Sequence, residues 1–170
     1  MLISEAMRNV LLFILVLFTA CSKTQIAPSM SPSTPEPVPV AISLKNVVEA
    51  FNKANLPLTD SFVYDERTDI NHLLGRPNGY VEKMNFRDAR MKVKFKPKTN
   101  EERDMQRTCS IEVFASTENA QRRKDYIEAI GKSSPIFSAY CFLYRNILVR
   151  IDTELVPSDA NEYKAALESL

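Results

Sequence analysis

The sequence predicts an α+β domain, with an antiparallel sheet of about four to five strands and helices packed on one face. Hydrophobic spacing alternates between helical and strand-like along residues 42–170, in the order α-β-β-β-α-β-β-α. Several links between predicted strands have hairpin length, which favours antiparallel pairing. Hydrophobic residues make up 45% of the chain and charged residues 25%, as in an ordinary globular protein with a single core.

The first part of this domain predicts one helix followed by less regular chain. Ser43 is the expected N-cap, and the helix ends before residues 55–57. Its apolar residues recur on one side: Val47, Val48, Phe51 and Ala54. A short extended piece covers residues 61–64. Asp69 then caps a turn or two of helix, which Gly75 ends in the left-handed conformation.

The middle of the domain predicts a hairpin, a strand and a long helix. Residues 80–86 and 91–97 alternate between apolar and polar side chains and are joined by a short turn. A strand at 108–115 follows a charged loop and leads into a helix at about 118–130. We expect Ser116 or Thr117 to cap this helix, Gly131 to lie just past its end, and three residues to face inward: Ala120, Ile127 and Ile130.

The C-terminal part predicts a second hairpin and a final helix. Residues 140–144 and 147–151 are short apolar strands around a two-residue turn, Arg145-Asn146, in which asparagine tolerates the positive φ that such turns need. Proline is favoured in the first turn of a helix, so the last helix begins near Pro157.

The N-terminal region carries an apolar run, residues 10–18, that ends shortly before Cys21. The run is too short for a permanent helix across a bilayer core of about 30 Å, but it has the length of an export signal's hydrophobic region. A small residue followed at once by cysteine resembles the lipobox of bacterial lipoproteins, whose cysteine thiol receives a diacylglyceryl group and becomes the mature N-terminus. We expect residues 1–20 to be a signal peptide, beginning at Met1 or Met7, and Cys21 to be the lipid attachment site.

Two alternatives for this region are an uncleaved anchor helix and a secretory signal without lipidation. Residues 21–41 follow the signal and are rich in proline, serine and threonine, which predicts a disordered, extended tether. A single domain at 42–170 would then be held by lipid at the extracytoplasmic face of a cell membrane or outer membrane. The membrane is therefore one expected partner.

The two remaining cysteines, Cys109 and Cys141, both fall in predicted strands. In an oxidising compartment a disulfide between them would persist. The alternative is that both are small buried hydrophobic residues.

Catalytic and metal-binding motifs are absent from the sequence. His72 is the only histidine, and no CxxC pair, nucleophile elbow or phosphate-binding loop is present. The acidic residues Asp65, Glu66 and Asp69 fail the calcium-loop pattern, because Arg67 occupies the third position, and helix capping and solvation explain them. We therefore predict no enzymatic activity, no metal and no cofactor. The formal net charge of +1 argues against a nucleic-acid partner.

Alternating lysines in the predicted strand 91–97 and just beyond it form the most suggestive polar pattern: Lys92, Lys94, Lys96 and Lys98. On a strand these side chains would share one face and could bind an anionic partner, such as lipid headgroups or an anionic envelope polymer. The alternative is that they protect a sheet edge from aggregation. A charged run at residues 121–125 is explained as the exposed side of its helix.

The chain also resembles a group of small bacterial lipoproteins without a known activity. The resemblance is carried by Leu73-Leu74-Gly75-Arg76-Pro77-Asn78, by residues 111–114 and by residues 122–127. It implies the lipoprotein assignment and no reaction, ligand or site residue.

These observations lead to the hypothesis of a lipid-anchored, extracytoplasmic binding or interaction module at the cell envelope. Two alternatives belong to other functional classes. One is an envelope-acting hydrolase with carboxylates that the sequence does not pair. The other is a structural or assembly component whose sheet edge pairs with another envelope protein.

Overall fold

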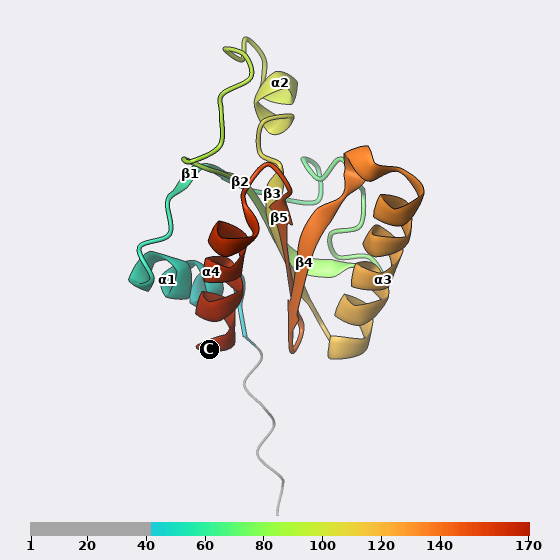
Figure 1. The fold of residues 1–170 in the computed structure, drawn as a ribbon. Coiled ribbons are helices and arrows are strands. Elements are labelled where there is room, and N and C mark those ends of the chain that lie inside the picture. The colour runs from blue at the N-terminus through green and yellow to red at the C-terminus, as the bar shows by residue number, and fades with distance from the viewer. Residues whose placement is uncertain (1–41) are drawn as a thin grey trace, which may run out of the picture. The chain divides into compact units, whose positions relative to one another are not determined.

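The computed structural model describes residues 42–170, which form an α+β domain around one five-stranded antiparallel sheet (Figure 1). The strands lie in the order β1-β2-β3-β5-β4. The element bounds are α1 (Leu44–Lys53), β1 (Leu58–Val63), β2 (Tyr80–Asp88), α2 (Asn100–Asp104), β3 (Cys109–Phe114), α3 (Thr117–Ser133), the 3-10 turn η1 (Pro135–Phe137), β4 (Ala139–Tyr144), β5 (Ile147–Asp152) and α4 (Pro157–Glu168). The predicted α+β class and antiparallel sheet are confirmed. Cys21, the signal peptide and the tether lie outside the described residues.

Local sequence explains where the helices begin. The Ser43 hydroxyl accepts a hydrogen bond from the Asn46 N–H at 3.4 Å, and the Asn46 side chain accepts one from the Ser43 N–H, so α1 starts with a reciprocal cap. Ser116 caps α3 through the Asn119 N–H at 3.2 Å. Helix α4 begins at Pro157 without a side-chain cap. In the described part of the chain, no helix has the length and apolar character needed to cross a membrane.

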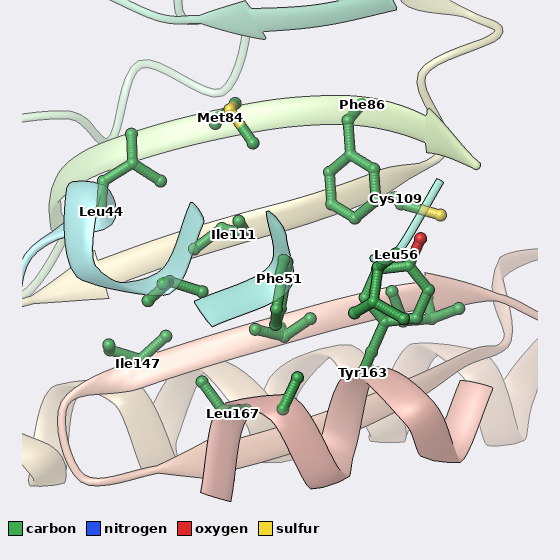
Figure 2. Packing of buried hydrophobic residues seen from close by; sticks show 14 of the residues in the cluster. Leu44, Phe51, Leu56, Met84, Phe86, Cys109, Ile111, Ile147, Tyr163 and Leu167 are labelled. Carbon is green, nitrogen blue, oxygen red and sulfur yellow. The ribbon is translucent and has the colours of Figure 1, made fainter. Parts of the chain in front are cut away.

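The sheet separates two hydrophobic cores, because successive residues of a strand point to opposite faces. The larger core lies between one face and the helices α1 and α4 (Figure 2). Its buried residues include Phe51, Met84, Phe86, Ile111, Ile147, Val149, Tyr163 and Leu167. The smaller core lies between the opposite face and α3, and it includes Tyr80, Phe114, Ala120, Ile127 and Leu148.

Helices therefore cover both faces of the sheet, whereas the sequence predicts helices on one face only (Figure 1). Strand β5 shows the reason. Ile147 and Val149 pack in the larger core, and Leu148 between them packs in the smaller core. A strand that is apolar on both sides needs cover on both sides.

Residues 91–97 form a loop, and the prediction of a strand there is wrong. Strand β2 ends at Asp88, and its outer side is already paired with β1, so no place in the sheet is left beside it. Of the alternating apolar residues only Met91 is buried, while Val93 is 59% and Phe95 41% exposed. The pattern of alternation is present, but the edge that it would need is occupied.

Cys109 and Cys141 are free thiols, so of the two alternatives for this pair the disulfide is not formed. Cys109 on β3 packs in the larger core, whereas Cys141 on β4 packs against the smaller core. Strand β5 also lies between their two strands. Two thiols on opposite faces of a sheet cannot reach bonding distance. Cys109 is instead a fully buried small residue, and burial raises the pKa of its thiol to about 11.

Two predicted turn positions also differ in the structure. Gly131 lies inside α3, which continues to Ser133, and does not follow the end of the helix. In the β4–β5 hairpin the positive φ belongs to Arg145, at 52°, and not to Asn146. The Asn146 side-chain amide donates to the Phe114 carbonyl at 2.8 Å, so this asparagine ties the hairpin to the end of β3.

Candidate functional site

A polar cleft of about 310 Å³ opens on the side of the sheet that faces α3. Its floor carries side chains from β2, β3 and β5: Lys83, Asn85, Ser110, Arg150 and Asp152. One wall comes from Ile70 and Asn71, and another from Asp104 and Arg107. The cleft lies in the size range of small-molecule sites in proteins, roughly 300–1,000 Å³.

Four buried polar side-chain atoms have no hydrogen-bond partner among the described residues, and all four belong to residues that line this cleft. They are Asn85 Oδ1, Thr108 Oγ1, Ser110 Oγ and Arg150 Nε. Leaving such an atom unpaired costs about 1–3 kcal/mol, so native proteins keep few of them. Their concentration in one cleft distinguishes it from the other hollows of the domain.

The strand register places three of these side chains next to one another. Asn85 on β2 pairs with Ser110 on β3, which pairs with Arg150 on β5. Directly paired residues of neighbouring strands point to the same face. We call these three residues the polar row.

Helix α3 leaves the polar row uncovered because it packs on the other end of the same face. Its buried residues Ala120 and Ile127 belong to the same cluster as Phe114 and Leu148. Phe114 is the last residue of β3, whereas Ser110 is near its start. The apolar end of the face therefore packs against the helix, and the polar end lies at the cleft.

Asp69 holds the segment that forms one wall of the cleft. Its carboxylate is fully buried and accepts hydrogen bonds from the Lys83 ammonium at 2.9 Å and the Tyr80 hydroxyl at 2.6 Å. The backbone N–H groups of Leu73 and Leu74 also donate to it, at 2.8 and 3.1 Å. The predicted helix after Asp69 is not formed. Its carboxylate instead joins a series of turns to β2.

Competing effects act on the pKa of the Asp69 carboxyl. Burial alone would raise the pKa, because it disfavours the charged form. The hydrogen bonds from Lys83, Tyr80 and the backbone outweigh burial, and the pKa lies well below its usual range. Asp69 is therefore a carboxylate that is held ionised by its partners.

A second group of charged side chains holds the wall that contains Asp104 and Arg107. The Arg107 guanidinium contacts the Asp104 carboxylate at 2.7 Å and the Asp60 carboxylate at 3.0 Å. The Tyr64 hydroxyl donates to the same Asp104 oxygen at 2.7 Å. Burial and this neighbouring carboxylate raise the pKa of Tyr64. Both walls are thus fixed by charged groups that are already satisfied.

Close packing of the backbone requires a glycine at position 79, directly after the Leu73–Asn78 run. The chain at Gly79 passes beside the Leu73 carbonyl. A Cβ atom at position 79 would lie 2.0 Å from the Leu73 carbonyl oxygen, far inside contact distance. We expect Gly79→Ala to displace the wall segment and to lower the free energy of unfolding by about 1–3 kcal/mol, measured by denaturant titration. Gly131→Ala is the comparison variant, since its Cβ would lie 3.3 Å from the Ser138 Cα, a tight approach that a shift of a few tenths of an ångström relieves. Equal stability of Gly79→Ala and the wild type would contradict this packing.

The four alternating lysines do not share a face of the sheet, because no strand forms at residues 91–97. Lys92, Lys94, Lys96 and Lys98 are all exposed in the loop before α2. The loop is attached at its base to Glu154, which accepts a hydrogen bond from the Lys92 N–H at 2.8 Å and lies 3.4 Å from the Lys94 ammonium. The lysines therefore neither line the cleft nor protect a strand edge.

The candidate residues Asp65 and His72 do not line the cleft. Asp65 accepts hydrogen bonds from the N–H groups of Arg67 and Thr68, both at 2.9 Å, which is a turn cap. His72 has a φ of 52° and is exposed on the same segment. In residues 42–170, no cluster of three or more histidine, cysteine or acidic residues has the arrangement of a metal site.

The polar row is the part of the site that sequence reasoning missed. A weak signal was present, because Ser110 and Glu112 alternate with the apolar residues Cys109, Ile111 and Val113 on a strand that is buried throughout. Polar residues at every second position of a buried strand indicate a face that is not filled by core packing.

Comparisons of this chain with protein-family models, with curated proteins and with solved structures found no match.

Proposed function

We propose that this protein is a lipid-anchored, extracytoplasmic binding module whose binding site is the polar cleft. The observation that carries the proposal is the set of four unpartnered buried polar atoms in one cleft. A bound ligand would supply the missing partners at no further desolvation cost to the protein. The fixed walls also favour binding, because a site that is already in place loses little conformational entropy when it is occupied.

The lowered pKa values of four carboxyl groups argue against these four groups as general acids. A hydrolase that uses a general acid near neutral pH needs a carboxyl group with a raised pKa. The pKa values of Asp69 and Asp88 are lowered by hydrogen bonds that outweigh burial. Those of exposed Asp65, in a turn, and exposed Glu101, at the start of α2, are also lowered by hydrogen bonds. These shifts are those of structural carboxylates.

Ser110→Ala tests the cleft without knowledge of the ligand. Because the Ser110 hydroxyl is buried and unpartnered, we expect its removal to leave the free energy of unfolding unchanged or to raise it by up to about 1 kcal/mol. Ser116→Ala is the matched control, since this serine caps α3 and its loss should cost about 0.5–2 kcal/mol. Both are measured by denaturant titration. A clear loss of stability in Ser110→Ala would show a structural hydroxyl and would contradict the proposal.

The anchor is tested by metabolic labelling with a fatty-acid probe. We expect the wild type to be labelled and Cys21→Ser to be unlabelled. Cys141→Ser is the control and should keep the label, because Cys141 lies half-buried in the sheet. An unlabelled wild type would remove the anchor from the proposal and leave the cleft.

Strand β4 favours a second candidate function, pairing with an envelope protein through a sheet edge. It forms one edge of the sheet, is paired with β5 along its whole length, and contains neither lysine nor proline. The other edge strand, β1, has an irregular register. A photo-crosslinker at Leu143 should capture an envelope protein in intact cells, and the same probe at exposed Val63 on β1 is the control. Equal or absent capture at the two positions would argue against pairing.

A further inference from the structure

Arg150 lies where the polar cleft meets a second hollow of about 360 Å³. We call this second hollow the apolar lobe. Arg150, Asn71 and Phe137 line both spaces, so the two are adjacent. The remaining lining of the apolar lobe comes from one side of α3: Arg123, Tyr126, Ile127 and Ile130.

Arg150 differs from the other cationic side chains near these two spaces. Lys83 lies 2.9 Å from Asp69, Arg107 lies 2.7 Å from Asp104, and Arg123 lies 3.0 Å from Glu112. Among the described residues, Arg150 has no carboxylate within ion-pair distance, and its side chain makes no hydrogen bond. Its Nε atom is nevertheless buried. A buried guanidinium nitrogen without a partner is costly, because charged groups need hydrogen bonds when they leave water.

We propose that the ligand of this cleft is an amphipathic organic anion. Its carboxylate or phosphate group is bound by Arg150, and its apolar body occupies the apolar lobe. This inference rests on the proposed binding function and names the chemical class of the ligand.

The polar row supplies the anion subsite. A guanidinium binds carboxylate or phosphate oxygens through parallel N–H donors, and its Nε–H is one of them. The unpartnered Ser110 hydroxyl, on the residue paired with Arg150, is a further donor on the same face. Ser110 is only 4% exposed and the Arg150 Nε atom is buried, so solvent screening is weak at these two donors.

Two carboxylates also line the polar cleft, beside its cations. Asp104 is paired with Arg107, and Asp152, two residues along β5 from Arg150, accepts a hydrogen bond from the Glu154 N–H at 2.8 Å. Both carboxylates repel an anion, and Arg150 is the cation whose charge is not balanced by an ion pair. The position of Arg150 at the boundary then leaves the rest of the ligand in contact with the apolar lobe.

The apolar lobe supplies a surface for a hydrocarbon or aromatic group. Phe137 of η1 is 60% exposed and Tyr126 of α3 is 59% exposed. Ile127 and Ile130 of α3 complete the apolar lining. Burial of this apolar surface by a hydrocarbon or aromatic group favours binding. An inorganic anion would gain none of this contribution.

The test compares an acid with its neutral amide and adds two phosphate probes. The full-length chain, labelled with 15N and held in nanodiscs of zwitterionic lipid, is titrated with 3-phenylpropionate and with its neutral amide. We expect 3-phenylpropionate to shift the amide signals of Ser110, Phe137 and Arg150, and to bind at least tenfold more tightly than the amide. 3-Phenylpropyl phosphate distinguishes a phosphate from a carboxylate ligand, and inorganic phosphate tests the anion alone. Tighter binding of either acid than of both the amide and inorganic phosphate supports the inference.

Two variants assign the effect to the guanidinium. Arg150→Gln should bind acid and amide equally, and Arg150→Lys should keep part of the preference for the acid. Arg122→Gln is the control, because Arg122 is exposed on α3 and pairs with Glu118. If the wild type bound acid and amide equally, with shifts at Ser110, Phe137 and Arg150, the inference would be overturned. The binding function would then remain in place. Binding of neither probe would also overturn it, and Ser110→Ala then decides separately on the binding function.

Discussion

Replacing Asp69 by asparagine is expected to lower the free energy of unfolding by about 3–5 kcal/mol, because it leaves the Lys83 ammonium buried without a counter-charge. The two side chains are 0% and 3% exposed and lie 2.9 Å apart. Asparagine keeps an oxygen for the backbone N–H groups that Asp69 binds, so the substitution acts mainly on the charge. The measurement is denaturant unfolding followed by circular dichroism.

A double-mutant cycle separates the ion pair from the turn that Asp69 also holds. Lys83→Met removes the other charge, and the double variant Asp69→Asn, Lys83→Met removes both. We expect the double variant to be more stable than the sum of the two single losses predicts, because it leaves neither charge unpaired. Additive losses would mean that the ion pair is not the source of the effect.

The pH dependence gives an independent check on Asp69. Its pKa in the folded protein lies below the ordinary value of 3.8, so its contribution to stability is present above that pH and is lost as the pH falls toward the folded-state pKa. The wild type should therefore lose stability steeply between about pH 4 and pH 2, and Asp69→Asn less steeply. Asp88, whose pKa is also lowered, keeps some acid sensitivity in the variant.

Tyr163→Ala is expected to have a comparably large effect, a loss of at least about 3–5 kcal/mol. Tyr163 is fully buried where α4 meets α1 and β2 (Figure 2). Its ring centroid lies 5.2 Å from that of Phe51 and 5.8 Å from that of Phe86. Its hydroxyl donates to the Asp88 carboxylate at 2.6 Å. Alanine would leave a cavity in the larger core and remove this hydrogen bond.

Tyr163→Phe separates the ring from the hydroxyl. Phenylalanine keeps the packing and removes one donor to a buried carboxylate, so we expect a loss of about 1.5–3 kcal/mol. Thermal and denaturant unfolding of the two variants give the contribution of the ring by difference. If Tyr163→Phe were as unstable as Tyr163→Ala, the hydrogen bond rather than the packing would hold α4 in place.

The parts of the fold that depend on local patterns could be predicted from the sequence. The caps at Ser43 and Ser116 and the β4–β5 hairpin follow from residues close together in the chain. Residues 91–97 show the limit of such reasoning. Their alternation suits a strand, but whether a strand forms depends on which segment reaches the outer side of β2, and β1 pairs there. That competition between distant segments leaves no trace in the local pattern.

The contacts that form the candidate site could not be predicted from the sequence, because they join residues that are far apart in the chain. Asp69 stood out as a capping residue, yet its main partner, Lys83, lies on another element. Asn85, Ser110 and Arg150 are far apart in the sequence and meet only through strand register. A polar residue in a strand is not unusual by itself. The lack of partners becomes visible only when all three positions are seen on one face.

One face of the sheet is filled by the larger core, whereas the other carries the smaller core and the cleft. Residues of the cleft can therefore change without loss of the larger core. Cohesion comes chiefly from the larger core with α1 and α4, and Asn85, Ser110 and Arg150 take no part in that core. Their side chains could be exchanged for others without dismantling the scaffold, which makes their specificity open to selection or redesign.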